Sequence, residues 1–145
     1  MKKIFLAIIA ATMLFSLTSA PKIFVGTEYS TVAVVDARNS LPLTIEFVHS
    51  VQKTPVIEEL EFYSGEFILR RTIYQSQGVG LPFDAADGNF RREGNFFIMD
   101  DMNRPVKNLE LRTGKGTRLK ITLDGKTFNL YKKFPVGTKI LVKTF

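Results

Sequence analysis

The chain has 145 residues and contains no cysteine, no tryptophan and a single histidine, His49. Without cysteine it cannot form a disulfide framework, a thiolate metal site or a cysteine nucleophile. It cannot be a lipoprotein either, because a cysteine carries the lipid of such proteins. One histidine without cysteine also argues against a zinc centre. We therefore expect neither a metal nor a cofactor.

The chain also lacks an apolar run of membrane-spanning length. The longest run, Ile4–Leu17, covers 14 residues, fewer than the roughly 20 that a spanning helix needs. It follows Lys2-Lys3 and precedes small residues, a pattern typical of a secretory signal. Pro21 directly follows the expected cleavage position, where signal peptidases cut poorly, so an uncleaved anchor is the alternative.

These features predict the domain organisation and the location. We expect residues 1–20 to be a signal peptide or an N-terminal membrane anchor, and residues 21–145 to form a single β domain. The protein is expected to be exported and extracytoplasmic, whether periplasmic, on the cell surface or secreted. Contact with the membrane is expected only through the N-terminal segment if that segment is not cleaved.

Charge is unevenly distributed along the chain. The formal net charge is +6, yet residues 104–145 carry eleven basic and two acidic residues. Such a segment either solvates the outer faces of strands or presents a basic surface to an acidic partner. It lacks the regular aromatic residues of a base-stacking platform, so we do not expect nucleic acid as a partner.

Residues 21–145 read as short strands separated by turn residues, with no convincing helical periodicity. The pattern predicts an all-β fold, a small antiparallel β-sandwich or barrel-like domain after the N-terminal signal or anchor helix. The predicted strands are Lys22–Gly26, Thr31–Ala37, Pro42–Ser50, Val56–Tyr63, Glu66–Tyr74, Asn95–Met99, Val106–Arg112, Thr117–Leu123, Lys126–Tyr131 and Lys139–Lys143.

One hairpin can be predicted with its register. Asp124-Gly125 stands between two alternating segments, and this dipeptide favours a type I′ turn because both central residues need positive φ. A two-residue turn pairs Ile121 with Phe128. Both side chains then lie on one face of the hairpin, as a half-buried pair of strands requires.

A second hairpin predicts a polar pair on the core side. A turn centred on residues 53–54 pairs Phe47 with Leu60 and places His49 opposite Glu58. Both ionisable residues continue an apolar phase of their strands, so both are expected to point toward the core. A buried charge needs a partner or solvent, which makes this pair a candidate site.

Arg71 interrupts the apolar face of the following strand and is expected to join His49 and Glu58. The three residues form either an internal ion-pair network that fixes the register or a polar pocket at the end of the sheet. Ser50 neighbours His49 in a strand, so its side chain points to the opposite face. A Ser–His catalytic pair is therefore not supported.

Gly78 and Gly80 follow the same strand in the sequence Gln75-Ser-Gln-Gly-Val-Gly. Two glycines one residue apart allow positive φ and a close approach of the backbone to a ligand. Successive amide N–H groups in such a loop can bind an anion. A plain tight connection is the alternative interpretation.

The block from Leu43 to Glu59 holds His49-Ser50-Val51 and Pro55-Val56-x-Glu58-Glu59, and Gly78-Val79-Gly80-Leu81-Pro82 follows it. The combination resembles the bacterial and archaeal domain-of-unknown-function family numbered eighteen-fifty, from about Ser40 to the Asp124-Gly125 turn. This family has no established activity. Its genes commonly lie beside TAXI-type TRAP transporters, so the resemblance implies an exported accessory protein of such a transporter.

The sequence thus predicts an exported, non-catalytic accessory or binding protein, whose partner is a TRAP-type transporter component or a small anionic solute. The alternatives are a structural envelope protein that docks through the basic C-terminal face and a metal-independent hydrolase, for which no nucleophile is placed. The candidate ligand-binding residues are His49, Ser50, Lys53, Glu58, Arg71, Gly78 and Gly80.

Overall fold

The computed structural model describes residues 21–38, 40–77, 81–107 and 109–145. The predicted signal or anchor segment, residues 1–20, lies outside them. Within the described residues, no helix is long and apolar enough to cross a membrane. The strands are β1 (Lys22–Gly26), β2 (Thr31–Asp36), β3 (Leu41–Val48), β4 (Pro55–Tyr63), β5 (Glu66–Tyr74), β6 (Asn89–Glu93), β7 (Phe96–Asp100), β8 (Arg104–Val106), β9 (Leu109–Arg112), β10 (Lys120–Leu123), β11 (Lys126–Asn129) and β12 (Lys139–Thr144).

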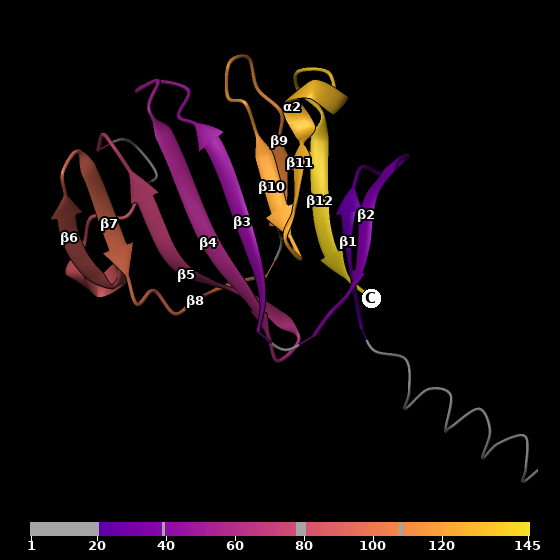
Figure 1. Ribbon diagram of the computed structural model, residues 1–145, viewed down its shortest axis with the longest axis horizontal. Helices are drawn as coiled ribbons and strands as arrows, with labels where there is room; N and C mark the ends of the chain where they lie inside the picture. The colour runs from indigo at the N-terminus through magenta and orange to yellow at the C-terminus, as the bar shows by residue number, and fades with distance from the viewer. Residues whose placement is uncertain (1–20, 39, 78–80, 108) are drawn as a thin grey trace, which may run out of the picture.

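The strands form two antiparallel sheets (Figure 1). The small sheet has the order β2-β1-β12-β9, and the large sheet has the order β11-β10-β3-β4-β5-β7-β6, with β8 also paired to β5. The β6 end of the large sheet and the β2 edge of the small sheet lie at opposite ends of the molecule in Figure 1. The prediction of a small antiparallel β-sandwich is confirmed.

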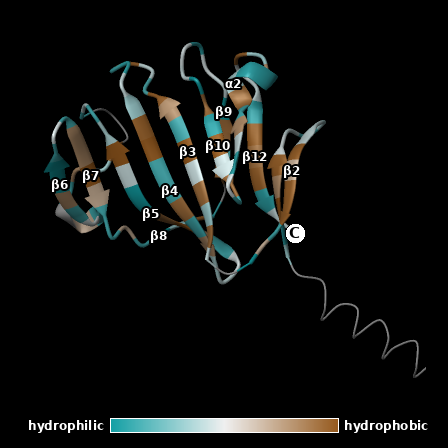
Figure 2. Cartoon of the chain, viewed as in Figure 1, coloured by the Kyte–Doolittle hydropathy of each residue, from teal (hydrophilic) through white to brown (hydrophobic). Residues whose placement is uncertain are grey.

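The main core lies between the two sheets. Apolar and polar residues alternate along the strands (Figure 2), so each sheet turns one apolar face toward the other. Full burial of each such side chain contributes about 1.5–3 kcal/mol. The buried residues of this core include Leu43, Ile45, Leu60, Phe62, Phe67, Leu69, Ile121 and Leu123 from the large sheet, and Ile23, Val25, Leu109, Ile140 and Val142 from the small sheet.

A second, smaller cluster lies toward the β7 side of the large sheet. It consists of Val56, Tyr74 and Leu81, packed against the partly buried Phe47 and Phe97. Leu81 belongs to the connection between β5 and β6, and the Tyr74 hydroxyl donates a hydrogen bond to the next carbonyl, that of Pro82. This connection therefore covers a part of the large sheet with a chain segment instead of a second sheet.

The Asp124-Gly125 turn is as predicted. Ile121 pairs with Phe128, and Leu123 pairs with Lys126 across the turn. Asp124 and Gly125 have φ of 51° and 72°. These values are what a two-residue hairpin turn of type I′ requires.

Several strand boundaries differ from the prediction. The predicted strand 106–112 is two strands, because the chain leaves β5 of the large sheet after Val106 and joins β12 of the small sheet at Leu109. The segment 126–131 ends in the short helix α2 (Leu130–Lys133). The edge strand β6 was not predicted, because its sequence Asn-Phe-Arg-Arg-Glu lacks apolar alternation. A 3₁₀ turn, η1 (Ala85–Asp87), precedes it.

Candidate binding site

His49 stabilises the turn between β3 and β4. Its Nδ1 accepts hydrogen bonds from the backbone N–H groups of Val51 and Gln52, at 3.3 and 3.2 Å. Its own backbone N–H bonds the Thr54 carbonyl at 2.8 Å, and the Lys53 N–H returns to the His49 carbonyl at 3.0 Å. The imidazole therefore supplies an acceptor to amides that the turn leaves unpaired.

The predicted register of this hairpin is wrong. Phe47 pairs with Val56 and not with Leu60, and Glu58 lies opposite Ile45 and not opposite His49. The turn is longer than predicted, because residues 50–53 all lie in it and Lys53 adopts a φ of 56°. Thr54, whose carbonyl is bonded to the His49 N–H, comes directly before β4, and Glu58 lies four residues further along the chain. His49 and Glu58 are therefore separated by about 13 Å along the strand.

Glu58 does face inward as predicted, because the error in register is an even number of residues. On either side of it in β4 lie the buried Val56 and Leu60, and Thr72, fully buried, stands opposite on β5. Burial raises the pKa of Glu58 above its usual value of 4.5, and the positive charge of Arg104 opposes this rise.

Arg71 faces outward, which corrects the prediction that it shares a face with Glu58. The pairing of β4 with β5 shifts by one residue, so that Glu59 pairs with Arg71 but Leu60 pairs with Leu69. Arg70 is the extra residue of this β-bulge. One added residue moves every later side chain of the strand to the other face.

The outward position gives Arg71 carboxylate partners. It bridges Glu59, at 3.2 Å, and Asp100 of β7, while Arg91 of β6 binds Asp100 from the other side at 2.5 Å. Burial alone would raise the pKa of Asp100, but the hydrogen bonds from Arg91 and Arg71 outweigh it and hold the pKa below its usual value of 3.8. These ion pairs join β4, β5, β7 and β6 on the outer face.

The five candidate residues that the structure describes therefore do not form one site. Ser50 and Lys53 are exposed in the turn, where the Lys53 ammonium donates to the Ser50 carbonyl. Glu58 lies on the inner face and Arg71 on the outer face. Gly78 and Gly80 lie outside the described residues, and so does the predicted anion-binding loop.

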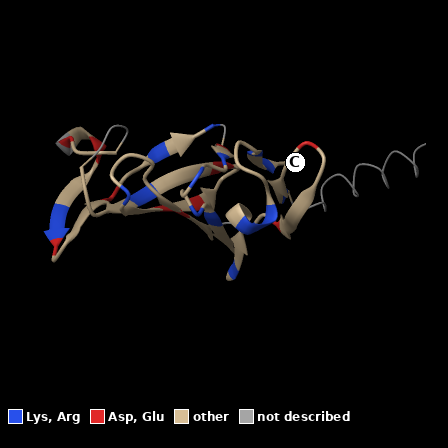
Figure 3. Ribbon diagram, turned by 90° about the horizontal axis from the view of Figure 1, so that it is seen from above, with Lys and Arg blue, Asp and Glu red and all other residues tan. Residues whose placement is uncertain are grey.

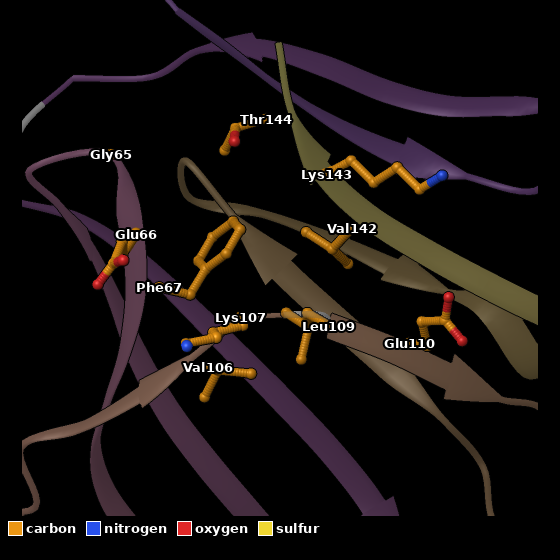
Figure 4. Close-up of a pocket in the computed structure, with 10 residues that line it drawn as sticks. All are labelled: Gly65, Glu66, Phe67, Val106, Lys107, Leu109, Glu110, Val142, Lys143 and Thr144. Carbon is orange, nitrogen blue, oxygen red and sulfur yellow. The ribbon is translucent and has the colours of Figure 1, made fainter.

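A pocket occurs elsewhere, where the two sheets part. It has a volume of about 350 Å³ and lies between the start of β5, the crossing from β8 to β9, and the end of β12 (Figure 4). Phe67, Val106, Leu109 and Val142 form its apolar lining. The other residues around it are Gly65, Glu66, Lys107, Glu110, Lys143 and Thr144.

The polar side of this pocket is formed by backbone and rim residues. The pairing of β12 with β9 covers only Lys139 to Val142. The backbone N–H and C=O of Thr144 therefore face the pocket, whereas those of Lys143 point toward Phe24 of β1. Lys107 belongs to the segment that crosses between the sheets. An apolar lining with a few polar groups at one side is the usual composition of a small-molecule site.

Sequence reasoning missed this pocket because no local motif marks it. The alternation in Glu66–Tyr74 and Lys139–Lys143 predicts that Phe67 and Val142 face inward. The pocket itself depends on where the chain crosses from the large sheet to the small sheet, which is directly after Val106. The sequence predicted one continuous strand from Val106 to Arg112 instead. The only available signal was Pro105, because proline weakens a strand and favours an edge or an end.

The basic residues of the C-terminal part lie on several elements, and some of them are ion-paired. Figure 3 shows lysine and arginine spread over several elements. Two of these lysines are ion-paired, Lys120 with Glu46 and Lys139 with Glu110, both at 2.8 Å. Solvation of outer strand faces therefore accounts for part of the charge excess.

The fold and the pocket define a small two-sheet β-sandwich with a cavity at the edge between its sheets. The chain belongs to the family described as Domain of unknown function (DUF1850), whose model matches residues 43–130. The match covers the large sheet from β3 to the start of α2, whereas β1, β2 and β12 of the small sheet lie outside it. No curated protein and no solved structure matches the chain.

Proposed function

We propose that this chain is an exported, non-catalytic binding protein, which holds a small anionic solute with an apolar body in the pocket between its sheets. We further propose that it serves as an accessory to a TAXI-type TRAP transporter. The family membership supports the proposed transporter role, because genes of TAXI-type TRAP transporters commonly accompany genes of this family. The observation that carries the first step is the pocket itself.

The size and lining of the pocket support a small solute. About 350 Å³ lies at the lower end of the roughly 300–1,000 Å³ of ligand sites. Phe67, Leu109 and Val142 are at most 8% exposed, so their positions are fixed by the surrounding core. A lining held in this way needs little ordering when a ligand enters, and preorganisation favours affinity.

The part of the rim that suits a negatively charged head group is Lys107, since the other charged residues around the pocket are Glu66, Glu110 and Lys143. Lys107 is exposed and can reach a carboxylate at the mouth, and the backbone of Thr144, which has no partner strand on this side among the described residues, offers further polar groups on the opposite side. Glu66 disfavours a doubly charged anion on its side of the pocket. A monocarboxylate with a short alkyl chain satisfies both the rim and the lining.

The position of His49 supports a non-catalytic role. A general base must be within hydrogen-bond reach of a nucleophile or a substrate proton. Nδ1 of His49 already accepts two backbone N–H groups of its own turn, and the ring lies at the opposite end of β4 from the residues that lead to the pocket.

The test is a thermal-shift and calorimetric titration of the protein with butyrate, hexanoate and octanoate at millimolar concentrations. We expect one of them to raise the melting temperature and to bind at a single site. Lys107→Glu and Val106→Phe, which respectively reverse the rim charge and fill the cavity, should weaken binding at least about tenfold, equivalent to 1.4 kcal/mol.

Two further variants serve as controls. Lys126→Glu makes the same charge reversal at the exposed first residue of β11 and should leave binding unchanged. His49→Ala should lower stability by about 1 kcal/mol, because two turn amides lose their acceptor, while affinity stays the same. If none of the carboxylates binds, or if Lys107→Glu and Lys126→Glu weaken binding equally, the proposed solute site is wrong.

The transporter step is tested separately. The purified protein should bind the purified TAXI-type solute-binding protein encoded in the same genome, measured by interferometry. Absence of binding at micromolar concentrations with and without the carboxylate would reject this partner and leave the solute site untouched.

A further inference from the structure

Apart from the three-residue β8, which pairs only with β5 and holds Arg104 and Pro105, the described residues leave four edge strands, β11 and β6 in the large sheet and β9 and β2 in the small sheet. Exposed edges invite pairing with other chains, and proteins usually protect them with charges or by keeping them short. Three of these edges are protected. β6 carries three charges among five residues, β9 carries two among four, and β11 is four residues long and begins with a lysine.

The edge strand β2 lacks this protection. It spans six residues, and its only charge is at the last position, Asp36, which is held in an ion pair with Lys22 at 2.6 Å. The four residues from Val32 to Val35 are all apolar and three of them are β-branched. Val34 points away from the core and is 47% exposed. Within the part of the chain that the structure describes, no strand pairs with the outer side of β2, which therefore offers backbone groups without a charge that would repel a second strand.

We propose that β2 pairs antiparallel with β2 of a second copy of this chain, about a two-fold axis at Val34. The pairing joins the four-stranded sheets of the two copies edge to edge. It places the two Val34 side chains opposite each other on the outer face and Ala33 of one copy opposite Val35 of the other on the inner face. Both contacts are apolar, and both satisfy the rule that opposite residues share a face.

A second copy is favoured over a foreign strand because β2 is complementary to itself. A two-fold contact uses the same patch twice, and in this register no charged residue lies opposite a like charge. The two Asp36 carboxylates end about 14 Å apart along the strands, more than the Debye length of about 8 Å at physiological salt. Each remains beside its own Lys22. The edge is also far from the β6–β7 end of the large sheet (Figure 1), which leaves that end exposed in the dimer.

The test compares three forms of the protein by sedimentation equilibrium and light scattering over a range of concentrations. The wild-type protein should reach twice the monomer mass. Val34→Lys should be monomeric, because the two lysines would lie directly opposite each other, and like charges in this position are destabilising. Val136→Lys makes the same change at a residue that is 68% exposed in the turn before β12, and should dimerise like the wild type.

Hydrogen exchange of the wild-type protein gives a second readout that needs no variant. The backbone amides of residues 31–36 should exchange more slowly as the concentration rises, whereas those of β6 should not change. A wild-type protein that stays monomeric, or a dimer that survives Val34→Lys and is thus held elsewhere, overturns the proposal. A monomer whose β2 amides become protected only on addition of another protein overturns it equally, and assigns the edge to a foreign strand.

Discussion

The two ends of the large sheet are stabilised in different ways. Where the small sheet covers the inner face, nineteen buried residues form one core, which begins at β10 and β3 and extends to Met99 of β7. At the β7–β6 end a loop covers the same face, only three buried residues cluster beneath it, and ion pairs hold the outer face instead. The first end depends on apolar burial, and the second depends partly on charges that remain within reach of solvent.

Glu58 lies at the boundary between the two ends. In β4 it stands between Leu60, which belongs to the main core, and Val56, which belongs to the small cluster. Phe47 of the neighbouring strand contacts both clusters. Apolar side chains thus continue along the inner face of the large sheet from one cluster to the other. The Glu58 carboxylate lies among them, at the place where the small sheet stops covering this face and the β5–β6 connection begins to cover it. The two ends should therefore respond differently to truncation, salt and pH.

The largest difference is expected from truncation of a buried leucine at each end. Leu43→Ala leaves a cavity in the main core, where Leu43 is fully buried between β4 and β10, and should cost about 3–5 kcal/mol of unfolding free energy. Leu81→Ala affects a residue that is 8% exposed in the small cluster, and should cost about 2 kcal/mol or less. Urea denaturation measures both values.

Hydrogen exchange sharpens this comparison. Leu81→Ala should accelerate exchange in β6 and β7 while β3 and β10 stay protected, because the small cluster opens locally. Leu43→Ala should accelerate exchange everywhere, through global unfolding. Equal losses of stability with the same exchange pattern would mean that both ends form one cooperative unit.

An intermediate effect is expected for the ion pairs of the outer face. Arg71→Met keeps the apolar stem but removes the charge between Glu59 and Asp100. Since Arg71 is 41% exposed, solvent screens the interaction, and the loss should be about 1 kcal/mol. Lys22→Met, at the more exposed pair with Asp36, is the matched control and should cost less stability than Arg71→Met.

The pH dependence of this effect has a defined sign. The pKa of Asp100 lies below its usual value of 3.8, so its contribution is present above pH 3.8 and is lost as the pH falls through the lowered pKa. Arg71→Met should therefore reduce the loss of stability in acid, measured by thermal melts between pH 2 and 7 (roughly the range over which carboxylates titrate). If the melting temperature of Arg71→Met falls in acid as steeply as that of the wild type, Arg71 does not act on Asp100.

The same strands show what could be predicted from the sequence and what could not. Asp124-Gly125 specifies its own turn geometry, so the pairing of Ile121 with Phe128 followed from local residues alone. The turn at residues 50–53 contains no such dipeptide. Its length depends on the bonds from Val51 and Gln52 to His49, which become visible only in three dimensions.

The β-bulge at Arg70 was hidden for a similar reason. Phe67, Leu69, Arg71 and Ile73 alternate without interruption in the sequence, and nothing local marks an extra residue. The bulge lies opposite the segment that connects β7 to β8, the two strands that pair with β5 on this side. There the Met102 N–H donates a hydrogen bond to the Arg70 carbonyl at 3.0 Å. Pairing with a distant segment thus decides which face Arg71 occupies, and single-strand periodicity cannot supply that information.

The smallest effect on stability is expected for substitution of Glu58, and its pH dependence is opposite to that of Asp100. Burial raises the pKa of Glu58 above 4.5, so the stability it contributes is fully present below pH 4.5 and is lost as the pH rises through the raised pKa. Glu58→Gln removes this loss, and the variant should be more stable than the wild type at pH 7 but not at pH 4. Glu28→Gln, in an exposed turn, removes the same charge and serves as the control. If Glu58→Gln instead destabilises the protein at pH 7, the ionised carboxylate is compensated by Arg104, and the inner face then relies on charge pairing as the outer face does.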